Sequence, residues 1–151
     1  VQNFFWIGFI KLFFPNSKII ITDRNSKDIC LSIFKINFKN GFMNFAYNQK
    51  DIANFYNLYS DLISFWKKLF PNELYTIKYE DLIKDQEKET KKLIDFCDLD
   101  WDPNCLRHDK NKSAIKTASA GQARKPIYKS SLNLSENYSK YLGEMFSLLE
   151  N

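Results

Sequence analysis

The sequence predicts an α/β fold in which helices flank a parallel sheet. Two short runs, residues 18–22 ("KIIIT") and 74–80 ("LYTIKYE"), are rich in branched and aromatic side chains and are typical of strands. The first run is almost continuously apolar, which indicates a parallel strand covered on both faces. Segments with helical periodicity precede, separate and follow the two runs, and this order predicts a right-handed crossover between parallel strands.

Helices are expected on both sides of the first strand. Residues 4–14 predict a buried helix that ends at Pro15. After the strand, Asn25 is a suitable N-cap, and Asp28 in the first turn complements the helix dipole. We therefore expect a second helix that extends to about Phe38.

The rest of the chain is expected to be mainly helical. Residues 51–70 are the clearest helix, because apolar and aromatic side chains recur there every three or four positions. A helix at 86–97 and a short helical turn from Asp102 follow. Residues 112–131 are polar and irregular, which makes them a candidate ligand loop. Residues 135–149 predict a closing helix with an inward face, formed by Tyr138, Tyr141, Leu142, Met145 and Leu149.

Composition excludes some classes of function. The 151 residues are 44% hydrophobic and 26% charged, with a net charge of +4, which is typical of one globular domain. Basic and acidic residues alternate, as in "KDQEKETKK", and this pattern predicts a solvated surface rather than a nucleic-acid interface. A mild positive charge still suits an anionic ligand.

Cysteine and histidine give no metal-binding pattern. The three cysteines, Cys30, Cys97 and Cys105, lack metal-ligand spacing, and His108 is the single histidine. We therefore expect free thiols in a reducing, cytoplasmic compartment and no metal. The apolar stretch at residues 1–14 is interrupted by Lys11 and is too short to span a membrane.

The predicted sheet is incomplete. A strand as apolar as residues 18–22 requires neighbours, yet one other convincing strand is present, and two-stranded parallel sheets are rare as free-standing cores. The chain also starts without a methionine. We expect the remaining strands to lie upstream in a longer polypeptide.

A candidate site lies where the first strand ends. A polar turn between a parallel strand and a helix is the usual ligand position in open α/β sheets, and the helix N-terminus favours phosphate. Arg24 adds a guanidinium that can bind phosphate through two nitrogens, and Ser32 follows on the helix. Local alternatives are a surface salt bridge from Arg24 to Asp23 or Asp28, and a buried packing role for Ser32.

The sequence also resembles a known family. "LFFPNSKIIITDRNSKDICLSIF" closely resembles the sulfotransferases that use 3′-phosphoadenosine 5′-phosphosulfate (PAPS), in particular the bacterial branch related to protein-tyrosine sulfotransferases and often fused to tetratricopeptide repeats. The resemblance continues in order through "AYNQKDIANFYNLYSDLISFWKKLFP", "IKYEDLIKDQEKETKKLIDFCDLDWDPNCL" and "KNKSAIKTASAGQARKPIYKSS". It implies a P-loop-like three-layer α/β fold, with residues 1–151 as the carboxy-terminal part of a sulfotransferase domain.

The resemblance implies a role for each candidate residue. Arg24 and Ser32 would bind the 3′-phosphate of PAPS, and Tyr79 would lie beside the adenine, although an aromatic at a sheet end is the local alternative. In the later loop, Ser119 matches a serine near the sulfuryl group. The other polar residues of that loop would close over the donor: Gln122, Arg124 and Lys125.

Two departures from the family pattern affect the site. The family's Gly-Arg-Trp after "PIYKSS" is replaced by Asn133-Leu134-Ser135, so we expect one phosphate contact to be lost or to come from Lys129. The Gly-rich loop for the 5′-phosphosulfate and the catalytic base have no counterpart in these residues. Glu80 and Asp81 are expected to cap the segment that follows them.

The expected function is sulfuryl transfer from PAPS to an acceptor hydroxyl on protein tyrosine, carbohydrate or a small molecule. The residues at 35–49, "KINFKNGFMNFAYNQ", are candidates for acceptor contacts. Upstream tetratricopeptide repeats are a possible partner segment. The alternative is a non-catalytic module that holds the nucleotide or packs against a partner. A kinase would require a GxxxxGK[ST] loop, which the sequence lacks.

Overall fold

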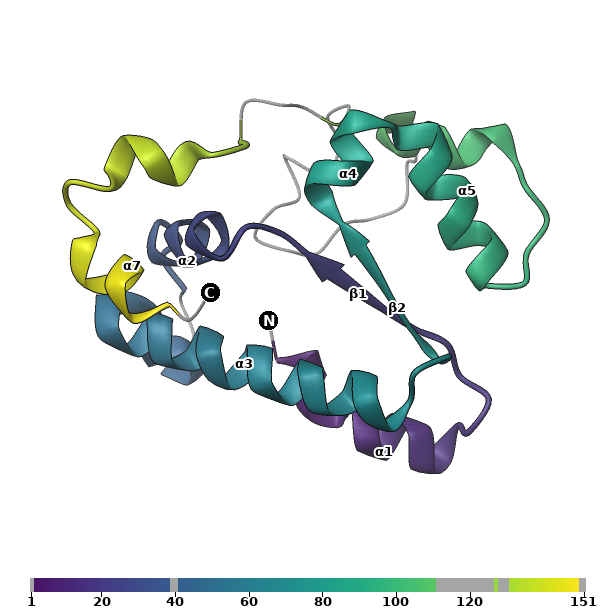
Figure 1. The fold of residues 1–151 in the computed structure, drawn as a ribbon, viewed down its shortest axis with the longest axis horizontal. Helices are drawn as coiled ribbons and strands as arrows, with labels where there is room; N and C mark the ends of the chain where they lie inside the picture. The colour runs from purple at the N-terminus through teal and green to yellow at the C-terminus, as the bar shows by residue number, and fades with distance from the viewer. Residues whose placement is uncertain (1, 39–40, 111–126, 128–130, 150–151) are drawn as a thin grey trace.

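Two parallel strands, β1 (Ile19–Asp23) and β2 (Leu74–Lys78), form the sheet, and their register pairs Ile19 with Leu74 and Asp23 with Lys78. In Figure 1, α1 and α3 lie on one side of this sheet, and α4 and α5 lie on the other. The predicted α/β fold with a parallel sheet flanked by helices is confirmed. The structure is a computed structural model that describes residues 2–38, 41–110, 127 and 131–149.

The prediction that β1 is covered on both faces is wrong for the described residues. Ile21 is buried, but Ile20 is 44% exposed. Ile20 pairs with Tyr75 of β2. Helix α5 (Gln86–Phe96) covers this face of the sheet over β2, where Phe96 stacks on Tyr75. Because α5 packs against β2, the same face of β1 stays exposed at Ile20.

The first helical segment packs on one side only. A 3₁₀ turn, η1 (Asn3–Trp6), leads into α1 (Ile7–Phe13), in agreement with the predicted helix. Phe4 and Ile7 are buried against α3 and the sheet. The prediction that the whole segment is buried is wrong, because six large side chains on it are exposed: Phe5, Trp6, Phe9, Leu12, Phe13 and Phe14.

Lys11 fixes the end of α1 relative to both strands. Its ammonium group is buried and donates hydrogen bonds to the carbonyl oxygens of Pro15 and Ser17, just before β1. It also forms an ion pair with Glu73, just before β2. A buried lysine requires such partners, since an unpaired buried charge is strongly destabilising.

The helix after β1 is shorter than the sequence predicts. The predicted N-cap is confirmed, because the Asn25 side chain accepts a hydrogen bond from the Asp28 amide at the start of α2 (Ser26–Phe34). The helix ends at Phe34 rather than near Phe38, since the Ile36 amide donates to Ile33 in a tighter turn. A 3₁₀ segment, η2 (Gly41–Tyr47), follows.

Helix α3 (Gln49–Leu69) connects two hydrophobic clusters and matches the prediction closely. Asn48 caps it by accepting hydrogen bonds from the amides of Lys50 and Asp51. At one end, Ile52 and Ala53 pack with α2 and α7 (Gly143–Leu148). At the other end, Ile63 packs with α1 and the sheet. This helix therefore connects the sheet and α1 with α2 and the C-terminal helix α7.

The second strand ends earlier than expected, at Lys78, because a short helix not predicted from the sequence, α4 (Tyr79–Lys84), begins directly after it. Asp85 then caps α5 by accepting from the Lys88 amide, and α5 matches the prediction. Two 3₁₀ turns follow, and the first confirms the turn expected from Asp102: η3 (Pro103–Leu106) and η4 (His108–Lys110).

The predicted closing helix is wrong as a single element. A 3₁₀ turn, η5 (Leu134–Tyr138), is separated from α7, which restarts at Gly143. The amides of Tyr141 and Leu142 both donate to Tyr138, which closes the first turn before a glycine with low helix propensity. Tyr138 and Tyr141 are consequently exposed, whereas three of the predicted inward residues are buried: Leu142, Met145 and Leu149. No helix of the described residues is both long and apolar enough to cross a membrane.

We expect Gly8→Ala to lower the free energy of unfolding by about 1–3 kcal/mol, as overpacking does. A Cβ at position 8 would lie 2.7 Å from Cη2 of Trp66, so α1 would be forced away from α3. Gly143→Ala is the matched control, because a Cβ there meets nothing within 4 Å. Urea denaturation measures both variants. Equal stability of the two would contradict the close approach of α1 to α3.

Candidate functional site

The carboxyl ends of β1 and β2 bring two predicted site residues together. Arg24 follows β1 directly, and Tyr79 follows β2. Because the strands are parallel and Asp23 pairs with Lys78, these residues share one edge of the sheet. The Arg24 guanidinium carbon lies 5.1 Å from the centroid of the Tyr79 ring, which is a cation–π geometry.

A cavity of about 680 Å³ opens beside these strand ends, and we call it the strand-end cavity. Its polar wall contains Arg24, Ser32 and Tyr79, which are the predicted site residues that the structure describes. Ser32 is exposed, so its alternative role as a buried packing residue is wrong. Thr22 and Asp23, at the end of β1, also line the cavity, and its remaining lining residues are apolar or aromatic: Phe4, Ile29, Ile33, Ile36, Phe38, Phe55, Tyr56 and Tyr59.

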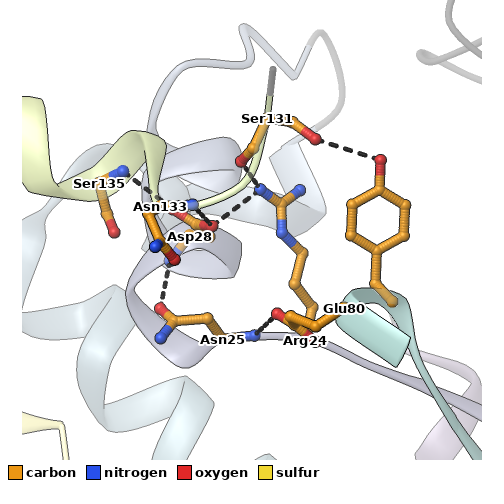
Figure 2. A network of polar contacts seen from close by, with 8 residues as sticks. Arg24, Asn25, Asp28, Glu80, Ser131, Asn133 and Ser135 are labelled. Carbon is orange, nitrogen blue, oxygen red and sulfur yellow. Dashed lines mark hydrogen bonds and ion pairs between the residues drawn. The ribbon is translucent and has the colours of Figure 1, made fainter. Parts of the chain in front are cut away.

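Arg24 forms the salt bridge with Asp28 that was the local alternative, but the pair is largely buried rather than on the surface. One terminal nitrogen, Nη2, lies 3.0 Å from Oδ2 of Asp28 and also donates to the Ser131 carbonyl oxygen (Figure 2). The Nε atom is buried and has no hydrogen-bond partner within the described part of the chain. The salt bridge therefore leaves a donor of Arg24 unsatisfied, and both interpretations of Arg24 can hold together.

Asp28 is the buried centre of the contacts in Figure 2. It is 2% exposed and accepts from Arg24 at 3.0 Å and from the amides of Asn133 and Ser135 at 2.9 Å each. Burial alone would raise the pKa of Asp28, but the hydrogen bonds from Ser135 and Arg24 outweigh it and hold the pKa below its usual value. Asp28 is therefore a carboxylate at neutral pH.

The segment 131–135 returns to the strand ends from far along the chain. The hydroxyls of Tyr79 and Ser131 lie 3.1 Å apart and share a hydrogen bond. Asn133 has a φ of 54°, in the left-handed region that glycine adopts most easily and that asparagine tolerates best among other residues. Asparagine can thus replace the glycine that the resemblance leads one to expect at this position.

Glu80 connects the two strand ends. It lies in the first turn of α4, where a capping carboxylate is expected, but its side chain accepts from the Asn25 amide at 2.8 Å.

Two tyrosines that line the cavity have raised pKa values. Burial and, to a smaller extent, the nearby Asp23 raise the pKa of Tyr56 to about 12, and the same two causes raise the pKa of Tyr59. Both phenols are therefore protonated at neutral pH.

The later predicted loop cannot be placed. Ser119, Gln122, Arg124 and Lys125 lie outside the described residues, as does Lys129, so their roles remain predictions. Among the residues that are described, no group of three or more His, Cys, Asp or Glu side chains is arranged to hold a metal ion.

A cavity at the carboxyl ends of parallel strands is the usual position for a ligand in open α/β proteins, and here a half-buried arginine lines it. Residues 1–103 match the model of the sulfotransferase family, and the chain belongs to that family. An uncharacterized protein of Aquifex aeolicus (strain VF5) is 37% identical over 151 residues, which cover 99% of this chain and 20% of that protein. The chain thus spans about a fifth of the length of the curated relative it matches.

We expect Asp28→Asn to lower the free energy of unfolding at pH 7 by about 1–3 kcal/mol, because buried donors lose their acceptor. The pKa of Asp28 is lowered by folding, so its carboxylate contributes fully above the unfolded aspartate pKa of about 3.9. That contribution is lost as the pH falls through the lower folded pKa. The difference between wild type and Asp28→Asn should therefore shrink below about pH 4.

Urea denaturation at several pH values measures this difference. Asp61→Asn, an exposed substitution on α3, is the matched control and should change stability by less than about 0.5 kcal/mol. A difference between wild type and Asp28→Asn that stays constant with pH would show that the carboxylate charge is not what stabilises this region.

Proposed function

We propose that this chain is part of a PAPS-dependent sulfotransferase and that the strand-end cavity holds the 3′-phosphoadenosine portion of the donor. Membership of the sulfotransferase family supports sulfuryl transfer in general. The observation that carries the finer proposal is Arg24, whose buried Nε has no described partner and whose guanidinium lines the cavity beside the Tyr79 ring.

The chemistry of the cavity wall fits a phosphorylated adenosine. Arg24 carries a permanent positive charge and a buried donor, and Ser32 adds an exposed hydroxyl on the same wall, so both suit the 3′-phosphate. Tyr79 offers an aromatic edge for the adenine. The start of α2, capped by Asn25, places the positive end of a helix dipole close by. By the family resemblance, Ser119 and the loop residues Gln122, Arg124 and Lys125 would complete the donor site.

PAPS supplies the sulfuryl group in this proposal. A bond forms between the acceptor oxygen and sulfur as the bond from sulfur to the phosphate oxygen breaks, and adenosine 3′,5′-bisphosphate leaves. The acceptor hydroxyl gives its proton to a general base, which the resemblance leads us to expect outside residues 1–151. Binding and orientation by cationic groups account for most of the catalysis in transfers of this kind. Arg24 and Ser32 would orient the donor by its 3′-phosphate. The acceptor remains open between protein tyrosine, carbohydrate and a small molecule.

We also propose that residues 1–151 form the carboxy-terminal part of a larger sulfotransferase domain. The open face of β1 at Ile20 and the exposed apolar side of α1 support this, since such surfaces are normally covered. The bacterial branch related to protein-tyrosine sulfotransferases and the tetratricopeptide repeats remain predictions. A non-catalytic module would bind the same nucleotide but would not transfer sulfuryl groups from PAPS.

Calorimetry should show that the folded chain binds adenosine 3′,5′-bisphosphate more tightly than ADP. Arg24→Ala should cost about 1.5–3 kcal/mol of that binding, the range for a charged hydrogen-bonding partner. Ser32→Ala should cost about 0.5–1.5 kcal/mol, because a neutral hydroxyl is lost.

Lys78→Ala is the matched control for Arg24→Ala, because it removes one positive charge from an exposed residue at the end of β2 that does not line the cavity. Circular dichroism checks that each variant is folded. Equal affinity of the wild type for the two nucleotides, or a folded Arg24→Ala that binds as the wild type does, would refute the assignment.

A further inference from the structure

Three hydrogen-bond donors from two distant parts of the chain converge on the two carboxylate oxygens of Asp28. Oδ2 accepts from Nη2 of Arg24 and from the Asn133 amide, and Oδ1 accepts from the Ser135 amide. The two amides lie 105 and 107 residues further along the chain. Figure 2 shows these contacts around a single buried side chain.

These contacts also set the orientation of Arg24. Both hydrogen bonds that the guanidinium makes to described residues leave from Nη2, one to Asp28 and one to the carbonyl of Ser131. The guanidinium carbon lies over the Tyr79 ring, and the hydroxyl of Tyr79 also contacts Ser131. With Nη2 occupied, the buried Nε is a donor that has no acceptor within the described part of the chain.

The acceptors that orient Arg24 depend on segment 131–135 being docked. Ser131 contacts Arg24 and Tyr79, and the amides of Asn133 and Ser135 in the same short segment are bound to Asp28. A long arginine side chain has many rotamers, and fixing them before a ligand arrives lowers the cost of binding. The docked segment therefore prepares Arg24 for an anion.

We propose that Asp28 is a positioning residue that couples the docking of segment 131–135 to binding of the 3′-phosphate by Arg24. This inference rests on the proposed function, in which the strand-end cavity holds 3′-phosphoadenosine. Asp28 does not line the cavity and acts through Arg24. The affinity for the 3′-phosphate consequently depends on a segment at the opposite end of the sequence.

Asp28→Asn tests the acceptor. An asparagine side chain has one acceptor oxygen, and its amide nitrogen would face a donor, so it cannot satisfy all three partners. Glu80→Gln is the matched control, because Glu80 also sits at the strand ends but accepts one described hydrogen bond, which a glutamine oxygen can keep. The readout is the ratio of dissociation constants for ADP and adenosine 3′,5′-bisphosphate, two nucleotides with the same number of phosphates that differ in whether the second phosphate is on the 3′ oxygen or on the 5′ chain.

We expect Asp28→Asn to reduce this ratio by about ten- to a hundredfold, the size of a charged hydrogen bond. Glu80→Gln should change it by less than about twofold, as surface substitutions do. A purely structural role for Asp28 would weaken the binding of both nucleotides equally and leave the ratio unchanged.

Substitutions of Asn133 test the segment without changing the side chain of Arg24 or Asp28. Asn133→Pro removes the amide hydrogen and cannot adopt a φ of 54°, so the segment should leave Asp28. Asn133→Gly keeps both the amide and the left-handed conformation. Although this exposed residue does not line the cavity, we expect Asn133→Pro to reduce the ratio as Asp28→Asn does, and Asn133→Gly to keep it.

If the variants fail to fold, hydrogen exchange on the wild-type chain tests whether docking of segment 131–135 is coupled to binding of the 3′-phosphate. The amides of Asn133 and Ser135 should exchange more slowly with adenosine 3′,5′-bisphosphate than with ADP. Unchanged exchange, or a folded Asp28→Asn or Asn133→Pro with the wild-type ratio, would overturn the coupling while leaving the proposed function intact. A wild type that shows no preference for the 3′-phosphate would instead overturn the proposed function.

Discussion

A carboxylate buried away from water must be satisfied by hydrogen bonds, and the arrangement of the strand ends depends on how Asp28 meets this requirement. Its partners are the strand-end arginine and the backbone of segment 131–135. The same region binds Nη2 of Arg24 through Asp28 and the Ser131 carbonyl, whereas Nε of Arg24 has no partner among the described residues. One buried acidic group thus connects the end of β1 with the C-terminal part of the chain.

The rest of the fold keeps these partners in place. Helix α3 packs at one end against α1 and the sheet, and at the other end against α2 and α7. Lys11 ties the end of α1 to the residues that precede each strand. The apolar surfaces that stay open, on α1 and on β1, are those that further parts of a larger domain would cover in our proposal.

Local signals in the sequence identified most of the elements but not the contacts between them. The cap at Asn25 and the periodicity of α3 act over a few residues, so both could be predicted. The helix α4 and the break between η5 and α7 were missed, because apolar spacing alone does not show where a helix ends. Arg24, Ser32 and Tyr79 were expected at one site, and the structure places them around one cavity. The role of Asp28 could not be found from spacing, since two of its partners are amides more than a hundred residues away, which any residue type except proline can supply.

A crystal structure of the chain with adenosine 3′,5′-bisphosphate would test the central claim most directly. We predict that the 3′-phosphate accepts a hydrogen bond from Nε of Arg24, with the adenine beside Tyr79, while Nη2 remains on Asp28. A nucleotide bound elsewhere, or a 3′-phosphate that does not contact Arg24, would contradict the assignment of the strand-end cavity as the donor site.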